Sequence, residues 1–222
     1  MKVEDNNVTE QEIESIKEAV QKRQPIDFYC YTLTPDQKVR FQKILSIFLK
    51  ECNQEYLYNY LSYCLFELLD NASKANAKRV YFKENKLNIN DEKDYKSGME
   101  AFKSDLTEHT DHYLEELKSG KLMVHLLLSA NGVITITVSN NTKITDAEYQ
   151  RIHDKIEKTK NYDDLSDAIA DIDQTEGSGL GIITVIIMLK KLGLTPNNLS
   201  FDITDNETVA TIKIPKDVME EV

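Results

Sequence analysis

The chain has 222 residues, of which 41% are hydrophobic and 29% are charged, and it carries a net charge of −11 at pH 7. These values predict one well-cored globular domain and argue against a nucleic-acid partner, which requires a basic surface. The most apolar stretch, Gly179–Leu189, is too short to span a membrane, and Met1–Asn7 lacks the apolar run of a signal peptide. Three widely spaced cysteines indicate reduced thiols. We therefore expect a cytoplasmic protein without membrane insertion.

The first predicted elements are a helix, a strand and a second helix. Charged and weakly amphipathic residues predict a helix from about Thr9 to Lys22, and we interpret residues 1–25 as an N-terminal helical extension. Aromatic and β-branched residues in Ile26–Thr32 are typical of a strand. Thr34 precedes a proline, which predicts an N-cap and a helix from Pro35 to about Cys52.

The central part of the sequence predicts another helix and a polar segment. The helix is expected from about Glu55 to Ala75, followed by a strand at Arg79–Phe82. From Asn85 to Gly120 the chain is mostly polar, with a helical stretch near Tyr95 to Leu117. We interpret residues 85–120 as an insertion, either a side lobe that packs against the main sheet or, as the favoured alternative, a solvated helical excursion.

The C-terminal half supplies most of the predicted sheet. Two alternating apolar segments are joined by Asn131-Gly132, a dipeptide that strongly indicates a hairpin turn. The predicted elements are the strands Leu122–Ser129 and Val133–Val138, the helices Asp146–Lys160 and Ile182–Leu192, and the strands Leu199–Ile203 and Thr208–Ile214. This order predicts an α+β fold, a two-layer sandwich with a mixed sheet covered on one face by helices.

One helix carries an acid, an amide and a cation on a single face. Glu67, Asn71 and Lys74 are spaced at i, i+4 and i+7. Such a row suits a magnesium-bound triphosphate, because the acid can orient a nucleophile, the amide can ligate the metal and the cation can meet phosphate. A solvated charged face is the other interpretation. The apolar residues around Glu67 favour a position at the edge of the core, where a carboxylate needs a partner or a function.

A glycine-rich loop precedes the most apolar helix. In Glu176–Gly181 the residues Gly177, Gly179, Leu180 and Gly181 would place unobstructed backbone amides at a helix N-terminus, which together form an anion site. A flexible turn that caps a buried helix is the alternative. The loop does not directly follow a strand and lacks the ending of a Walker loop, so a dinucleotide-binding fold and a P-loop are not expected.

These motifs resemble the ATP-binding domain shared by DNA gyrase, sensor histidine kinases and related ATPases, the GHKL family. Glu67–Ala72 is similar to its N box, Glu176–Gly181 to its second glycine box, and Thr208–Pro215 to its closing strand. The resemblance covers about residues 26–216. It implies a Bergerat-type fold over residues 26–222, with an ATP lid at 142–176, and ATP and Mg²⁺ as cofactors. It also implies site roles, namely Glu67 as the catalytic acid or base, Asn71 as the magnesium ligand, Lys74 as a phosphate contact and Thr208 as an adenine contact.

The adenine motif departs from the family pattern. The family places an aspartate and two glycines after a strand, whereas this chain has Asn140 at the aspartate position and neither glycine. An asparagine carbonyl can accept a hydrogen bond from the adenine amino group, although more weakly than a carboxylate. We therefore assign Asn140 to the adenine site.

Family resemblance indicates a nucleotide site and leaves the reaction open. No phosphoacceptor histidine precedes the N box, since the first histidine is His109. A stand-alone domain of this size resembles the anti-sigma serine kinases, which implies that Glu67 activates a hydroxyl on a partner protein. The alternative is a non-catalytic regulator that senses a nucleotide and binds a partner. A homodimer is compatible with either interpretation.

Overall fold

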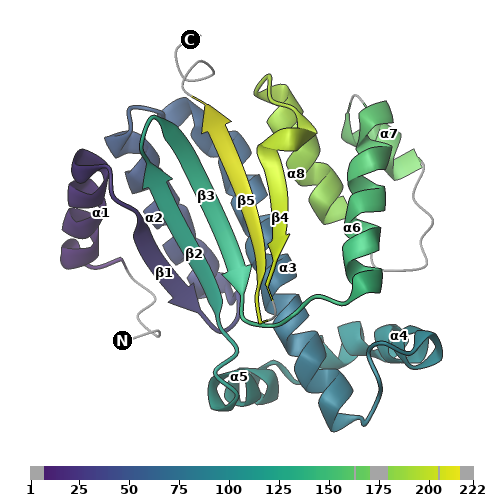
Figure 1. Cartoon of the computed structure of the whole chain (residues 1–222). Helices are drawn as coiled ribbons and strands as arrows, with labels where there is room; N and C mark the ends of the chain where they lie inside the picture. The colour runs from purple at the N-terminus through teal and green to yellow at the C-terminus, as the bar shows by residue number, and fades with distance from the viewer. Residues whose placement is uncertain (1–7, 163, 171–179, 205, 216–222) are drawn as a thin grey trace.

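The computed structural model describes residues 8–162, 164–170, 180–204 and 206–215, and this part of the chain has an α+β fold (Figure 1). One five-stranded sheet has the strand order β1-β2-β3-β5-β4. The strands are β1 (Ile26–Cys30), β2 (Val124–Ala130), β3 (Val133–Asn140), β4 (Leu199–Ile203) and β5 (Thr208–Pro215). Figure 1 shows long helices packed across one face of the sheet, which confirms the predicted two-layer sandwich.

The sheet is antiparallel rather than mixed. Each of the four strand pairings in the described residues is antiparallel. The chain leaves the sheet after β3, passes through helices and returns as β4 at the outer edge of β5. β5 therefore lies between β3 and β4. Although β3 and β4 run in the same direction, they are not neighbours, so no parallel pair forms.

The main core lies between the sheet and three helices. These are α2 (Pro35–Glu51), α3 (Tyr58–Glu84) and α8 (Leu180–Lys191). At the start of α2 the Thr34 side chain accepts a hydrogen bond from the Gln37 amide, as the N-cap prediction requires. Fully buried residues from the helices and the strands meet in this core, among them Phe41, Ile44, Leu65, Leu69, Ile186, Leu126, Ile136 and Ile212.

The long helix α3 continues through the segment that we expected to be a strand. It runs from Tyr58 to Glu84, a length of about 40 Å at the usual rise per residue. The expected strand Arg79–Phe82 is therefore wrong. Val80 and Phe82 are buried against other helices, and a short apolar run cannot by itself distinguish a buried helix from a strand.

The polar insertion forms two helices on the C-terminal half of α3. They are α4 (Glu92–Glu108) and α5 (Thr110–Ser119), and they meet at His109 instead of forming one helical stretch. Figure 1 shows them flanking the lower end of α3, below the sheet. A second apolar cluster joins the three helices and consists of Ala77, Val80, Tyr81, Phe82, Tyr95, Phe102, Tyr113 and Leu117. The insertion thus packs mainly on α3, so the alternative in which it packs against the main sheet is wrong.

Gly98 on α4 is buried against α3. A Cβ atom at this position would lie 2.7 Å from Cζ of Phe82, whose ring is buried. We expect Gly98→Ala to lower the free energy of unfolding by about 1–2 kcal/mol, because overpacking outweighs the gain in helix propensity. Urea unfolding would measure the change, with the exposed Glu100→Ala of the same helix as a near-neutral control. An unchanged or higher stability of Gly98→Ala would contradict this packing.

The remaining helices lie at the two sides of the sheet. Next to β1, α1 (Glu10–Lys22) inserts the fully buried Ile16 into the main core. On the other side lie α6 (Asp146–Lys158) and α7 (Leu165–Ala170), beside α8 (Figure 1). Short 3-10 turns occur at Glu55–Leu57, Thr159–Asn161 and Pro196–Asn198. Among the residues described, no helix is long and apolar enough to cross a membrane.

Candidate functional site

A cavity of about 280 Å³ lies where α3, α4 and α6 meet the ends of β3 and β5. Its walls are largely apolar, and polar groups are placed at a few positions along them. The apolar lining includes Leu68, Ala72, Ala75, Met99, Val138, Ile144, Ile152, Ile182, Phe201 and Ala210, and the polar lining is Asn71, Lys78, Arg79, Tyr95, Asn140, Glu148, Arg151, Lys155 and Thr208.

Three of the residues predicted for the site line this one cavity. Asn71 comes from the middle of α3, Asn140 from the end of β3 and Thr208 from the start of β5. Asn140 and Thr208 are direct partners in the strand register. Residues that are distant in the sequence are thus brought together because β3 and β5 pair along the face that α3 covers.

Gly181 places the start of α8 against the predicted N-box face of α3. A Cβ atom on Gly181 would lie 2.5 Å from Oε2 of Glu67 and 3.3 Å from Nδ2 of Asn71. The absence of a side chain therefore permits this close approach. Leu180 is the first residue of α8, whereas Gly177 and Gly179 lie outside the described residues. The part of the glycine loop that the structure describes meets the predicted metal and acid residues.

Lys74 lies apart from the cavity. It does not contribute to the cavity lining, its side chain is 54% exposed, and its Nζ atom lies 2.5 Å from Oδ2 of Asp70. This is a surface pair at i, i+4 spacing, which contributes little to stability. The structure therefore places the predicted phosphate contact beside a carboxylate at the surface.

Glu67 has an environment that disfavours its charge. Burial raises the pKa of its carboxyl group, and the neighbouring charge of Asp70 raises it further. The charges of Lys74 and Lys38 act in the opposite direction but do not cancel these effects. A carboxylate with a raised pKa next to a cavity is a candidate acid or base.

A buried hydrogen-bond network holds Asn140. Its Nδ2 atom donates to Oγ1 of Thr142 at 2.7 Å and to Oδ1 of Asn76 at 3.1 Å. Asn76 is fully buried, and its own Nδ2 atom donates to the Met123 carbonyl at 3.2 Å. Oγ1 of Thr208 donates to the Thr142 carbonyl at 3.0 Å. The end of β3, the start of β5 and α3 are thus tied together at one end of the cavity.

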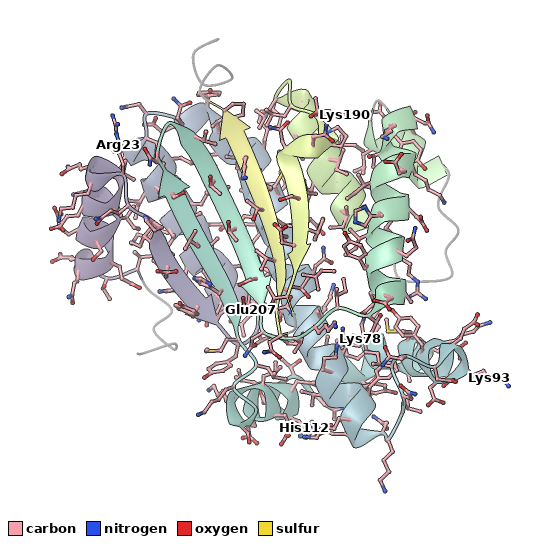
Figure 2. The ribbon with its side chains drawn as sticks, in the orientation of Figure 1. Arg23, Lys78, Lys93, His112, Lys190 and Glu207 are labelled. Carbon is pink, nitrogen blue, oxygen red and sulfur yellow. The ribbon has the colours of Figure 1, made fainter. Side chains whose placement is uncertain are left out.

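A charged cluster that the sequence did not predict forms the part of the cavity wall next to this network, where Arg79 also donates to the Lys143 carbonyl at 2.9 Å. Lys78 and Arg79 on α3 bind Glu148 on α6, with Nζ–Oε1 and Nη2–Oε2 distances of 2.6 Å. Figure 2 shows Lys78 on the side of α3 that faces the start of α6. Burial opposes ionisation of Glu148, but hydrogen bonding from Arg79 and the two positive charges outweigh it, so the Glu148 pKa lies well below its usual range.

The ring of Tyr95 on α4 lies beside this charged cluster in the cavity wall. Lys78 Nζ lies 5.5 Å from the ring centroid and Arg151 Cζ lies 4.4 Å from it. The helical insertion thereby becomes part of the cavity wall. Lys78 lies seven residues after Asn71, which places both residues on the same face of α3. The sequence-based prediction missed Lys78 because the predicted helix ended at about Ala75, three residues before it.

Helix α6 is fastened to the body of the protein at both ends. Glu148, which also caps the helix through Thr145, anchors its first turn to α3. After its last turn, Nζ of Lys190 on α8 donates to the carbonyls of Thr159 at 2.7 Å and Tyr162 at 2.8 Å, and Figure 2 shows Lys190 on α8 toward α6 and α7. The segment expected to be an ATP lid (142–176) thus contributes Ile144 and four residues of α6 to the cavity wall in this structure, and its residues 163 and 171–176 lie outside the described residues.

None of the four histidines lines the cavity. His125 stacks on Tyr29 and pairs with Asp27 on the sheet, and His153 packs against Tyr149. In the helical insertion, His109 lies beside Asp105, and His112 lies beside Glu84 at the end of α3. Each of the four histidines thus contacts a neighbouring side chain outside the cavity.

Comparisons with known proteins add one relative. The chain is 35% identical over 207 residues to an uncharacterized protein of Treponema pallidum (strain Nichols). The match covers 92% of this chain and 40% of the relative, so the chain spans about two fifths of that protein's length. No family model matches the chain, and no solved structure matches it.

Proposed function

We propose that the chain binds ATP with Mg²⁺ in this cavity and is a protein kinase that passes the γ-phosphate to a partner protein. The observation that carries the proposal is the convergence of Asn71, Asn140 and Thr208 on one cavity, with Gly181 against Glu67 and Asn71. These residues belong to four separate elements. Each stands at the position at which the family motifs imply a nucleotide or metal contact.

The chemistry of the cavity fits a nucleotide. A volume of about 280 Å³ is near the lower end of the range for small-molecule sites and accommodates a nucleoside portion. Apolar residues such as Leu68, Ala72 and Ile182 offer an apolar surface for the purine ring of a nucleotide. Asn71 lines the cavity and is also exposed to solvent, so its amide oxygen is available as a ligand for Mg²⁺.

Bound ATP with Mg²⁺ would supply the transferable γ-phosphate. The chain's own residues would position and activate the acceptor. Glu67 lies one helical turn before Asn71, and in its ionised form its carboxylate can take the proton of an acceptor hydroxyl. Its raised pKa suits this role, because a stronger base is a better proton acceptor once it is ionised.

A nucleotide-sensing regulator is the second candidate, and one observation favours it. Asn71, Asn140 and Thr208, which would contact the metal and the base, line the cavity, whereas Glu67, which would act as the base in transfer, does not. Tyr95 and Met99 of the helical insertion do line it. A bound nucleotide would therefore contact the insertion directly, and the exposed helices α4 and α5 would present a partner surface whose packing depends on the ligand.

Isothermal calorimetry with ATP tests the nucleotide site. We expect binding to the parent protein in Mg²⁺, and we expect Asn71→Ala to weaken it by about ten- to a hundredfold, because a ligand to a charged group is lost. In EDTA the two proteins should bind ATP alike. Asn59→Ala, an exposed asparagine in the first turn of the same helix, is the matched control. If the parent protein gives neither binding heat nor a thermal shift with ATP and Mg²⁺, the proposal fails.

A further inference from the structure

The orientation of the Asn140 amide is determined by a residue outside the cavity lining. Asn76 is fully buried on α3, and one end of its amide lies 3.2 Å from the backbone carbonyl oxygen of Met123. A backbone carbonyl can only accept a hydrogen bond. The amide end that faces Met123 must therefore be the NH₂ group, and the opposite end of the Asn76 side chain must be its carbonyl oxygen.

The same logic passes from Asn76 to Asn140. Oδ1 of Asn76 accepts from Oγ1 of Thr142 at 3.0 Å and from Nδ2 of Asn140 at 3.1 Å. A second backbone carbonyl, that of Thr142, lies 3.5 Å from the same Nδ2 atom. Because acceptors surround this side of Asn140, its NH₂ group must point here. Reversing the amide would bring acceptor against acceptor inside the protein, which costs the desolvation of an unpaired buried group.

The carbonyl oxygen of Asn140 is consequently the end of the amide that can accept a hydrogen bond from a ligand in the cavity. The side chain lines the cavity, and the hydrogen bonds that the described residues make with it all use Nδ2. Oδ1 is also not among the sealed polar atoms that lack a partner in the described residues. The cavity therefore presents a hydrogen-bond acceptor at this point, although an asparagine could in principle present either end.

We propose that Asn76 is a positioning residue that sets the base preference of the site. A carboxylate at position 140 would offer an acceptor in either orientation, whereas an asparagine does so only when its amide is fixed. With Oδ1 turned inward, the site selects a purine that carries an amino group at C6 over a purine that carries an oxygen there. This inference rests on the proposed nucleotide site and specifies its base.

The test compares ATP with inosine triphosphate, both with Mg²⁺, by calorimetry. We expect the parent protein to bind ATP about tenfold more tightly or better, because the oxygen at C6 would meet Oδ1 without a proton between them. In Asn76→Ala the Asn140 amide can turn, so the affinity ratio should fall toward one. In Asn76→Ala/Asn140→Asp the carboxylate presents an acceptor again, so the preference for ATP should return.

Controls separate a positioning role from a structural one. Asn141→Ala is the matched control, because the Asn141 amide bonds the neighbouring Lys121 carbonyl and Met123 amide without lining the cavity, and it should leave the ratio unchanged. If Asn76→Ala does not fold, Thr142→Val is the test variant instead. It removes the hydroxyl that hydrogen-bonds both Asn76 and Asn140, so it should lower the ratio of ATP affinity to inosine triphosphate affinity. An unchanged ratio in the variants overturns the inference alone. Loss of both nucleotides without recovery by Asn140→Asp also overturns it, and a parent protein that binds neither nucleotide overturns the proposed function as well.

Discussion

Replacing Glu148 with glutamine is expected to lower the free energy of unfolding by about 2–4 kcal/mol, because two largely but not fully buried cations would lose their common counter-ion. The side chains of Lys78, Arg79 and Glu148 are 14%, 17% and 10% exposed, so solvent can replace the lost carboxylate only in part. Urea or guanidinium unfolding at neutral pH would measure the effect. Glu157→Gln is the matched control on the same helix, since Glu157 and its partner Lys160 are 65% and 59% exposed and should contribute less than about 1 kcal/mol.

The contribution of Glu148 also predicts a dependence on pH. Its pKa is lowered in the folded protein relative to the ordinary value of 4.5, so the unfolded chain takes up the proton first on acidification. The stabilisation is complete above the unfolded pKa and is lost as the pH falls below it. The difference in stability between the parent protein and Glu148→Gln should therefore be constant from about pH 8 to 6 and shrink below about pH 4.5. A difference that persists unchanged in acid would contradict the assignment.

The second large effect is expected in activity. If the chain is a kinase, Glu67→Gln should lower γ-phosphate transfer by about 10²–10⁴-fold, because glutamine cannot take the proton of the acceptor. The affinity for ATP should change little, since Glu67 does not line the cavity. Release of labelled phosphate from ATP, to water or to an added acceptor protein, measures the rate. Retention of the full rate would exclude Glu67 as the base, and ATP-dependent partner binding that survives the substitution would favour the regulator.

The environment of Glu67 makes the pH profile a second measurement of the same role. Burial and the charge of Asp70 raise the Glu67 pKa, so the acidic limb of the rate profile should lie above the ordinary value of 4.5. Asp70→Asn removes one cause and releases Lys74 from its ion pair, so it should shift the limb to lower pH. Stability should stay equal or rise in Glu67→Gln, because the substitution removes a charge that burial disfavours.

The helical insertion contacts the charged cluster of α3 and α6. Tyr95 of α4 faces Lys78 of α3 and Arg151 of α6, so these three helices meet at one aromatic ring. A ligand that fills the cavity would contact Tyr95, Lys78 and Arg151, which all line it. Under the regulator hypothesis, the stability of α4 and α5 should therefore be coupled to nucleotide binding, whereas a simple kinase requires no such coupling.

Local signals determined much of what the sequence alone predicted. Thr34 and Pro35 specify the start of α2, and Asn131-Gly132 specifies the β2–β3 hairpin, because capping and turn geometry depend on neighbouring residues only. The i, i+4 spacing of Glu67 and Asn71 is likewise a local property of the helix. These features predicted the α+β class and the residues of the acid and metal face.

Tertiary packing decided the rest. The apolar run at Val80–Phe82 suits a strand or a buried helix equally, and only its contact with α4 and α5 made it the end of α3. That extension carries Lys78 and Arg79 to Glu148, and Asn76 to Asn140, partners that are 64 to 70 residues apart in the sequence. No periodicity encodes such pairings, because their energy comes from burial and hydrogen bonding that exist only when the elements are assembled. The chain's sequence thus specified the types of residue in its site, and the fold alone determined which atoms face the cavity.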